Sequence, residues 1–323
     1  QQYMETLKAL RLESNNPEGA IYTADQIAAV GKGTNWQDEI FRTSAPVQNY
    51  QLSISGGGEK HDFYLGLSYF DQQGVVKLSN LKKYNIRANM NLTPKEFLRF
   101  KFNMNYTRSD GNSTFENMDG TNEAAGPINS ALQFDPTLAP GIDPETGRYR
   151  KNSFIALDNP QALLYGISPE KQGNSVYGTF TTEIEPLKDL VATVRLGATI
   201  DTYTESSYRS RETMNGLASK GEASKKSEEK TQWLAEFLLS YKKNFNDIHK
   251  ITILAGTTFE QFSSQYIKGE AKGFLSDVTG SNSMHSGDNL NGDDVYSFKD
   301  RNRLNGFLGR VNYDLMNKYL LTA

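Results

Sequence analysis

The sequence predicts an all-β protein, an antiparallel up-and-down transmembrane β-barrel of which this chain supplies about ten strands. Three observations lead to this prediction. From residue 50 onward, apolar and polar residues alternate with a period of two, the pattern of a strand with one apolar and one polar face. The connections between these segments are alternately short and long. Aromatic residues stand at the ends of the segments on the apolar face.

Composition excludes several classes of protein. The net charge is −3, from 35 Lys+Arg and 38 Asp+Glu, so no basic field favours nucleic acid. The absence of cysteine excludes a disulfide scaffold and a thiolate metal site. No apolar run approaches the ~18 residues of a transmembrane helix, a run that membrane strands do not need. Only 37% of residues are hydrophobic but 11% are aromatic, which suits strands that bury one face.

Residues 1–49 are predicted to be a polar, partly helical extracellular loop. Thr23 and Gln26 form a capping box, in which Thr23 accepts from a backbone N–H and Gln26 reaches back. The helix is expected to end near Val30, before the glycines at 31 and 33. The first residues also have the pattern of a helix interior, and residues 319–323 that of a strand beginning. We therefore expect an internal fragment of a longer protein.

Residues 50–323 are predicted to form the partial barrel. Strands are expected at 50–56, 62–71, 83–93, 98–108, 174–184, 190–203, 231–243, 250–263, 303–313 and 319–323. Long extracellular loops are expected at 109–173, 204–230 and 264–302. In an up-and-down sheet every second connection lies at the same end, so all long loops share one end. Outer-membrane barrels have this asymmetry, with short periplasmic turns and long extracellular loops.

Strand length and side-chain placement support a membrane location. Most of the expected strands match or exceed the ~9–11 tilted residues that cross a bilayer. The strand-end aromatics resemble an interfacial girdle: Tyr50, Tyr69, Tyr84, Tyr106, Trp233, Tyr241, Phe259 and Tyr313. Charges on the polar face are expected to face a wet lumen or a plug: Arg87, Arg99, Lys101, Arg195, Lys242, Glu236, Glu260 and Arg310. The alternative is a soluble β-domain whose strand-end aromatics are ordinary core edges.

Four runs of sequence resemble one family, the SusC/RagA-like TonB-dependent outer-membrane transporters. The first comprises residues 35–43 and 48–57 and looks like an entry into an early barrel strand. The second, from Tyr69 to Gly74, resembles the second hairpin. Residues 134–160, with Phe134-Asp135-Pro136-Thr137 and Asp158-Asn159-Pro160, are similar to the first large loop. The last, made of residues 303–313 and 318–323, resembles a mid-barrel hairpin. Together the runs follow the order of the family along nearly the whole chain.

The resemblance implies a larger transporter in the outer membrane. The resemblance implies a 22-stranded barrel around an N-terminal plug, and this chain would cover about strands two to eleven of it. The resemblance implies a SusD-like lipoprotein as a lid over the extracellular loops, and energy from the inner membrane through TonB. It implies import of oligosaccharides, with peptides as an alternative cargo. A plug and TonB box would lie outside the chain.

No enzyme constellation is present. The histidines at 61, 249 and 285 are far apart in sequence and lack metal-ligand spacing. Gly56-Gly57-Gly58 lacks the signature of a phosphate loop and is expected to be a turn. The acidic run 286–294 is interpreted as a solvated loop, with a calcium site as the alternative. The mixed charges at 219–230 are expected at a solvated loop tip. We therefore expect no catalysis, no resident metal and no cofactor.

Candidate cargo contacts lie on the polar face and in the long loops. Asparagines at 85, 89, 91, 103 and 105 form an amide-rich wall that suits sugar hydroxyls or a plug equally. Loop aromatics that offer stacking faces are Tyr149, Phe154, Tyr165, Tyr296 and Phe298. The candidate substrate-binding residues are Arg87, Asn89, Asn103, Tyr149, Tyr165 and Tyr296. A passive porin and a soluble carbohydrate-binding module are the alternatives to an energised importer.

Overall fold

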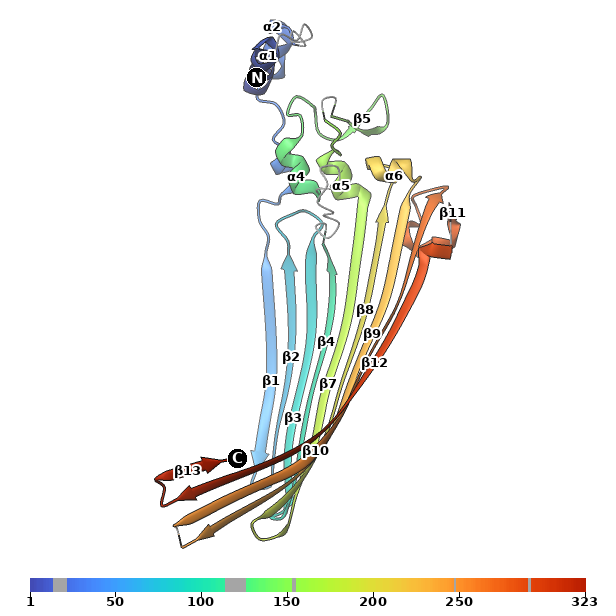
Figure 1. The fold of residues 1–323 in the computed structure, drawn as a ribbon. Coiled ribbons are helices and arrows are strands. Elements are labelled where there is room, and N and C mark those ends of the chain that lie inside the picture. The colour runs from blue at the N-terminus through green and yellow to red at the C-terminus, as the bar shows by residue number, and fades with distance from the viewer. Residues whose placement is uncertain (14–21, 114–125, 153–154, 247, 290–291) are drawn as a thin grey trace.

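The computed structural model describes residues 1–13, 22–113, 126–152, 155–246, 248–289 and 292–323. One large antiparallel sheet carries a group of short helices at one end (Figure 1). The helices are α1 (Gln2–Glu13), α2 (Ala24–Val30), α3 (Trp36–Ile40), α4 (Gly126–Gln133), α5 (Pro160–Gly166) and α6 (Met214–Ala218), with the 3₁₀ helices η2 (Gly280–Ser286) and η3 (Gly292–Asp294).

The strands of the large sheet follow one another in space as they do in the sequence. They are β1 (Val47–Gly58), β2 (His61–Gln73), β3 (Asn80–Lys95), β4 (Leu98–Asn112), β7 (Ile167–Leu187), β8 (Leu190–Arg209), β9 (Glu222–Phe245), β10 (His249–Phe274), β12 (Val295–Leu315) and β13 (Tyr319–Thr322). The short β11 (Gly287–Asn289) also pairs with β10. A separate ribbon joins β5 (Ile142–Asp143) to β6 (Arg148–Tyr149).

The two ends of the sheet differ as expected from the alternating connections. One end, called the short-turn end, holds the turns 59–60, 96–97, 188–189, 246–248 and 316–318. The opposite, long-loop end holds the connections 74–79, 113–166, 210–221 and 275–294 together with the helices (Figure 1). An up-and-down antiparallel sheet is therefore confirmed.

The strand centres match the predicted segments, but several strands extend further toward the long-loop end. The connection expected at 109–173 occupies 113–166, and that expected at 264–302 occupies 275–294. The largest correction concerns 204–230, because β8 continues to Arg209 and β9 begins at Glu222. Both faces of these extensions carry polar side chains, so the period-two contrast disappears while the backbone pairing continues.

The sheet has an apolar face and a polar face, as the alternation predicts. Large apolar side chains stay exposed on the apolar face, including Phe102, Phe180, Leu196, Phe237 and Leu239. Side chains of the polar face bond to one another across strands; Asn85 Nδ2 donates to Asn105 Oδ1 at 2.9 Å and to Thr107 Oγ1 at 2.8 Å. Such an exposed apolar face on a long sheet is typical of a wall that faces lipid.

The apolar segments are staggered relative to the pairing of the strands. The register row that contains Tyr84 on β3 reaches β10 at Gln265. The apolar run of β10, however, begins further down the strand, at Phe259. The apolar band therefore crosses the register diagonally. This stagger is what tilted strands need when a sheet curves toward a barrel.

A compact helical unit stands at the long-loop end above β1–β4 (Figure 1). Its core contains Trp36, Ile40, Val76, Ala131, Phe134, Leu157 and Leu164. These residues come from 34–42, 74–79 and the described parts of 126–166, which together are called the loop body. Trp36 is 2% exposed, donates from Nε1 to the carbonyl of Asp135 at 2.9 Å, and meets Phe134 edge-on.

A second small core ties two other connections together. Tyr208, Ala223, Ala271 and Phe274 are buried against Met284 of η2. Asp277 accepts from Tyr208 Oη at 2.7 Å and from Arg211 Nη1 at 2.8 Å. Arg211 Nη2 also donates to the carbonyl of Phe274. This clamp joins the connection 210–221 to the connection 275–294.

The N-terminal segment agrees with its helix signals. Thr23 and Gln26 form both bonds of the capping box, and α2 ends at Val30 with Gly31 at a φ of 62°. The first residues, which have the pattern of a helix interior, lie in α1. Within the described residues, no helix combines the length and apolar character that crossing a membrane requires.

Candidate functional site

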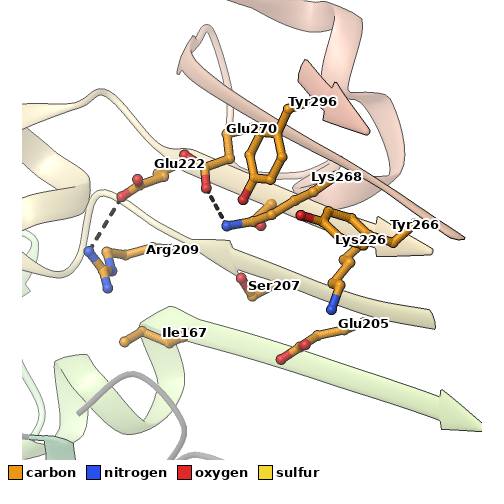
Figure 2. A pocket seen from close by; sticks show the side chains of 11 residues that line it. Ile167, Glu205, Ser207, Arg209, Glu222, Lys226, Tyr266, Lys268, Glu270 and Tyr296 are labelled. Atoms are coloured by element: carbon orange, nitrogen blue, oxygen red, sulfur yellow. Dashed lines mark hydrogen bonds and ion pairs between the residues drawn. The ribbon is translucent and has the colours of Figure 1, made fainter. Parts of the chain in front are cut away.

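The main cavity opens on the polar face near the long-loop end, across four neighbouring strands and the start of β7. Its volume is about 580 Å³. It is lined by Ile167, Glu205, Ser207, Arg209, Glu222, Ser224, Lys226, Tyr266, Lys268, Glu270 and Tyr296. Strand alternation directs these side chains into it, because each lies on the polar face of its strand. Figure 2 shows them converging from β8, β9, β10 and β12.

The charges of this cavity are largely matched in pairs. Lys268 Nζ lies 2.6 Å from Glu270 Oε1, and Lys226 Nζ lies 2.9 Å from Glu228 Oε2. Arg209 Nη1 lies 3.4 Å from Glu222 Oε2 (Figure 2). Lys226 and Lys268 face each other in register, an arrangement that like charges disfavour unless carboxylates stand beside them. The cavity thus offers donors and acceptors without a net field of one sign.

Two tyrosines give the cavity aromatic walls. The rings of Tyr266 and Tyr296 meet edge-on with centroids 6.2 Å apart. Lys226 Nζ stands 5.1 Å from the Tyr266 ring centre, and Lys268 Nζ stands 5.7 Å from that of Tyr296. Cation–π contacts of this kind hold both rings and cations in place. Aromatic faces beside fixed hydrogen-bonding groups suit a polar organic ligand.

A second hollow of about 420 Å³ lies further down the polar face. Its lining includes Lys101, Asn103, Thr179, Glu183 and Arg195. Glu183 accepts from Lys101 Nζ at 2.6 Å and from Arg99 Nε at 3.0 Å. The polar face here is a hydrogen-bonded wall whose side chains are already engaged with one another.

The loop body supplies a third group of candidates. Asn159 caps α5 by accepting from Gln161 N at 2.9 Å. Gln161 Nε2 in turn donates to Glu39 Oε2 at 2.8 Å and so ties α5 to α3. Tyr149 is partly buried; burial first and Glu212 second raise the pKa of its hydroxyl. This hydroxyl therefore remains a neutral donor at ordinary pH.

The structure separates the predicted site residues into three places. On the polar face, Asn89 pairs in register with Asn103, and Arg87 with Asn105; Asn103 Nδ2 bonds Thr179 Oγ1 at 3.2 Å. Tyr296 lines the main cavity. Tyr149 on β6 and Tyr165 on α5 belong to the loop body, where Tyr165 is half exposed. These six residues do not form one site.

Sequence reasoning missed most of the main cavity. Lys226 and Glu222 lie in the segment 219–230, which was predicted to be a solvated loop tip. Tyr266 and Lys268 fall in the expected loop 264–302. The spacing along β9 carried a usable signal. Residues 222, 224 and 226 lie an even number of residues from Glu236, so they share its face of the strand. Both faces of this part of β9 are polar, so the alternation that marks a strand is not visible there.

The remaining chemistry-bearing residues form no metal centre among the residues that the structure describes. The histidines stay apart, and His249 Nδ1 lies 2.7 Å from Tyr313 Oη. Phe154 and residues 290–291 lie outside the described residues, so their predicted roles, in the loop and in the acidic run 286–294, stay predictions.

The sequence has clear relatives among curated proteins. Two TonB-dependent receptors of Formosa agariphila are 28% and 30% identical to it over 298 residues, which are 89% and 90% of this chain. The SusC receptor of Bacteroides thetaiotaomicron is 34% identical over 134 residues, 39% of this chain and 12% of that receptor. No family model matches. The chain spans 28% of the length of either Formosa relative.

Solved structures show the same fold. The RagAB peptide transporter superposes with a TM-score of 0.73 at 19% identity, over 90% of this chain and 32% of that chain. The open-open state of the RagAB peptide importer gives 0.71 at 19% identity, over 88% of this chain and 31% of that chain.

The fold and the sequence together define the class. The staggered up-and-down sheet with an apolar outer face has the fold of part of a β-barrel wall, as in the RagAB peptide transporter. The chain is similar in sequence to TonB-dependent receptors, SusC among them, and it shares its fold with the RagAB peptide transporter. The curated relatives carry the names of receptors and not of enzymes, in agreement with the expectation that the chain catalyses no reaction.

Proposed function

We propose that this chain forms part of the barrel wall of an outer-membrane importer that takes up a large nutrient with energy delivered through TonB. The observation that carries the proposal is the two-faced, staggered sheet: exposed apolar side chains on one face, a hollowed polar face on the other. The receptor names of the relatives support the TonB dependence. In this proposal the long-loop end is extracellular and residues 1–49 lie there with the loop body.

The cargo that the main cavity favours is an oligosaccharide. Paired charges provide donors and acceptors around Tyr266 and Tyr296, and a neutral polyhydroxylated ligand uses both without leaving an unpaired charge. A peptide is the second candidate, and it is favoured by the fold shared with the RagAB peptide transporter. A SusD-like surface lipoprotein is the proposed partner at the long-loop end, because the SusC likeness implies one.

The energy coupling is tested by uptake in living cells. The complete receptor should accumulate cargo in cells with TonB and lose uptake when TonB is removed, with barrel abundance unchanged. Uptake that persists without TonB would instead indicate a passive porin. Purification of the tagged receptor in mild detergent tests the partner, since a stoichiometric lipoprotein is expected with it.

The cargo class is tested with a cavity variant of the complete receptor. Tyr296→Ala removes one aromatic wall, and Tyr64→Ala removes a tyrosine of the same face outside the cavity. Calorimetric titration with defined oligosaccharides and with peptides should show weaker oligosaccharide binding for Tyr296→Ala only. Equal affinity in both variants would remove the cavity from the cargo path, and binding of peptides alone would select the second candidate.

A further inference from the structure

The connection 210–221 leaves the sheet at the edge of the main cavity. It joins Arg209 of β8 to Glu222 of β9, two cavity residues that pair in register and form a 3.4 Å ion pair. Figure 2 shows this pair at one side of the cavity. The connection, called the bridging segment, contains α6 and has neighbours on both of its sides. A movement of the bridging segment therefore moves two residues that line the cavity.

The loop body holds the bridging segment on the first side. Asp158, which is only 5% exposed, accepts a hydrogen bond from the backbone N–H of Met214 at 2.7 Å, and Met214 is the first residue of α6. The carbonyl of Gly166, at the end of α5, accepts from Ser210 N at 2.7 Å. A Cβ at position 166 would lie 3.0 Å from Ser210 Oγ, so this contact is closely packed.

The Asp277 clamp holds the bridging segment on the second side. Asp277 accepts from Arg211 Nη1 at 2.8 Å and from the backbone N–H of the same arginine at 3.3 Å. At the other end of the segment, Phe274 N donates to the carbonyl of Lys220 at 2.9 Å. The segment is thus bonded on this side near its beginning and near its end.

The bridging segment has little room to deform between the two sides. Thr213, which is 1% exposed, caps α6 by accepting from Gly216 N at 3.0 Å. A side chain at position 216 would overlap the carbonyl oxygen of Ser210, so α6 packs directly on the beginning of its own segment. Closely packed elements transmit strain instead of absorbing it. A shift imposed on one side of the segment is therefore expected to reach the other.

We propose that the bridging segment couples the loop body to the clamp, so that these two small cores of the long-loop end open together. Asp158 and Asp277 are the carboxylates that make the coupling, one on each side of the segment. The coupling is reciprocal, because loosening either core removes a partner of the same segment. The coupling regulates the rim of the main cavity, and it rests on the proposed function only for the cargo that the cavity receives.

The test is hydrogen exchange on the complete receptor in detergent, without cargo. Asp158→Ala removes the acceptor of Met214 N in the loop body, and amides of 275–289 on the far side should exchange about fivefold faster or more. Asp277→Ala should likewise speed exchange in 126–152. Asp143→Ala is the matched control, because this carboxylate of the loop body pairs with Arg150 in the same unit. It should leave exchange in 275–289 unchanged.

A measurement on the wild type decides the question even where a variant does not assemble. The amides of Phe134 and Phe274, one from each core, should reach the same opening free energy and the same denaturant dependence as urea is added. Separate openings of these two amides would overturn the coupling, as would unchanged far-side exchange in either alanine variant. Uptake that persists without TonB would overturn the proposed function and leave the coupling in place.

Discussion

At the scale of the residue, the face that a side chain occupies decides what a substitution does. Phe102 and Asn89 lie on neighbouring strands, β4 and β3, on opposite faces of the same sheet. The alternation in the sequence is enough to assign both, because each flanking residue has the opposite polarity. The two residues therefore provide a matched pair for testing the orientation of the wall.

We expect Phe102→Arg to block assembly of the complete receptor. A cation that faces lipid at mid-depth costs about 2–4 kcal/mol in a barrel strand. Asn89→Leu should assemble nearly as the wild type, because residue 89 points to the wet face and the substitution places no charge in lipid. Heat-modifiable migration of outer-membrane fractions measures both. Normal assembly of Phe102→Arg would contradict the lipid-facing assignment of the apolar face.

Residue-level reading of the sequence had a clear limit. The amide wall of Asn85 and Asn105 was visible because apolar residues separate the amides. Lys226 was not recognised, because its neighbours on the opposite face, Lys225 and Ser227, are also polar. Where both faces of a strand are in water, apolar and polar residues no longer alternate, so the sequence pattern does not mark the strand. Side-chain partners on different strands, such as Arg195 on β8 and Glu236 on β9, depend on the register and cannot be read from one strand alone.

At the scale of the element, the connections are held by small cores of their own. The helix signals of α2 were readable from the sequence because capping is local. The loop body was not, because its core joins α3 to segments about 40 and 100 residues further along the chain, a combination that no local pattern reports.

Trp36→Ala should loosen the loop body and leave the sheet intact. Replacing a buried Trp by Ala costs about 3–5 kcal/mol of folding free energy. The core of the loop body is small, so this is a large part of its stability. Limited proteolysis should then cut within 126–166 sooner than in the wild type, while barrel assembly is unchanged. The exposed Leu132→Ala, on α4 of the same unit, is the control. Equal cleavage rates in the two variants would contradict the shared core.

The Asp277 clamp makes a prediction about two connections at once. Asp277→Ala leaves Tyr208 Oη and Arg211 without their common acceptor. Hydrogen exchange should become faster in both 210–221 and 275–289, since buried donors that lose their partner favour local opening. Faster exchange in only one of them would show that the clamp does not couple the two.

At the scale of the whole molecule, the fold depends on register. The ten strands that follow one another along the large sheet were predictable, because their central parts have one apolar face, whereas β5, β6 and β11 were not predicted. The stagger of the band emerges only from pairing across many strands. One residue inserted into a strand reverses the facing of everything beyond it.

An insertion series tests this dependence. One alanine added after Gly256 of β10 should abolish assembly, because half of the strand then presents the wrong face to lipid. One alanine added after Ser276, in the connection 275–294, should be tolerated. Outer-membrane abundance and heat-modifiability measure both. Assembly of the strand insertion with normal yield would contradict the register as a determinant of the fold.

The loop body also has a consequence for how such receptors diverge. Its interior is made by Trp36 and Ile40 before the first strand, Val76 between the second and third, and Phe134 and Leu164 much later. A mutation in any one of these stretches changes the fit of the other two. The three stretches therefore depend on one another, and a receptor that changes one of them is expected to change the other two as well.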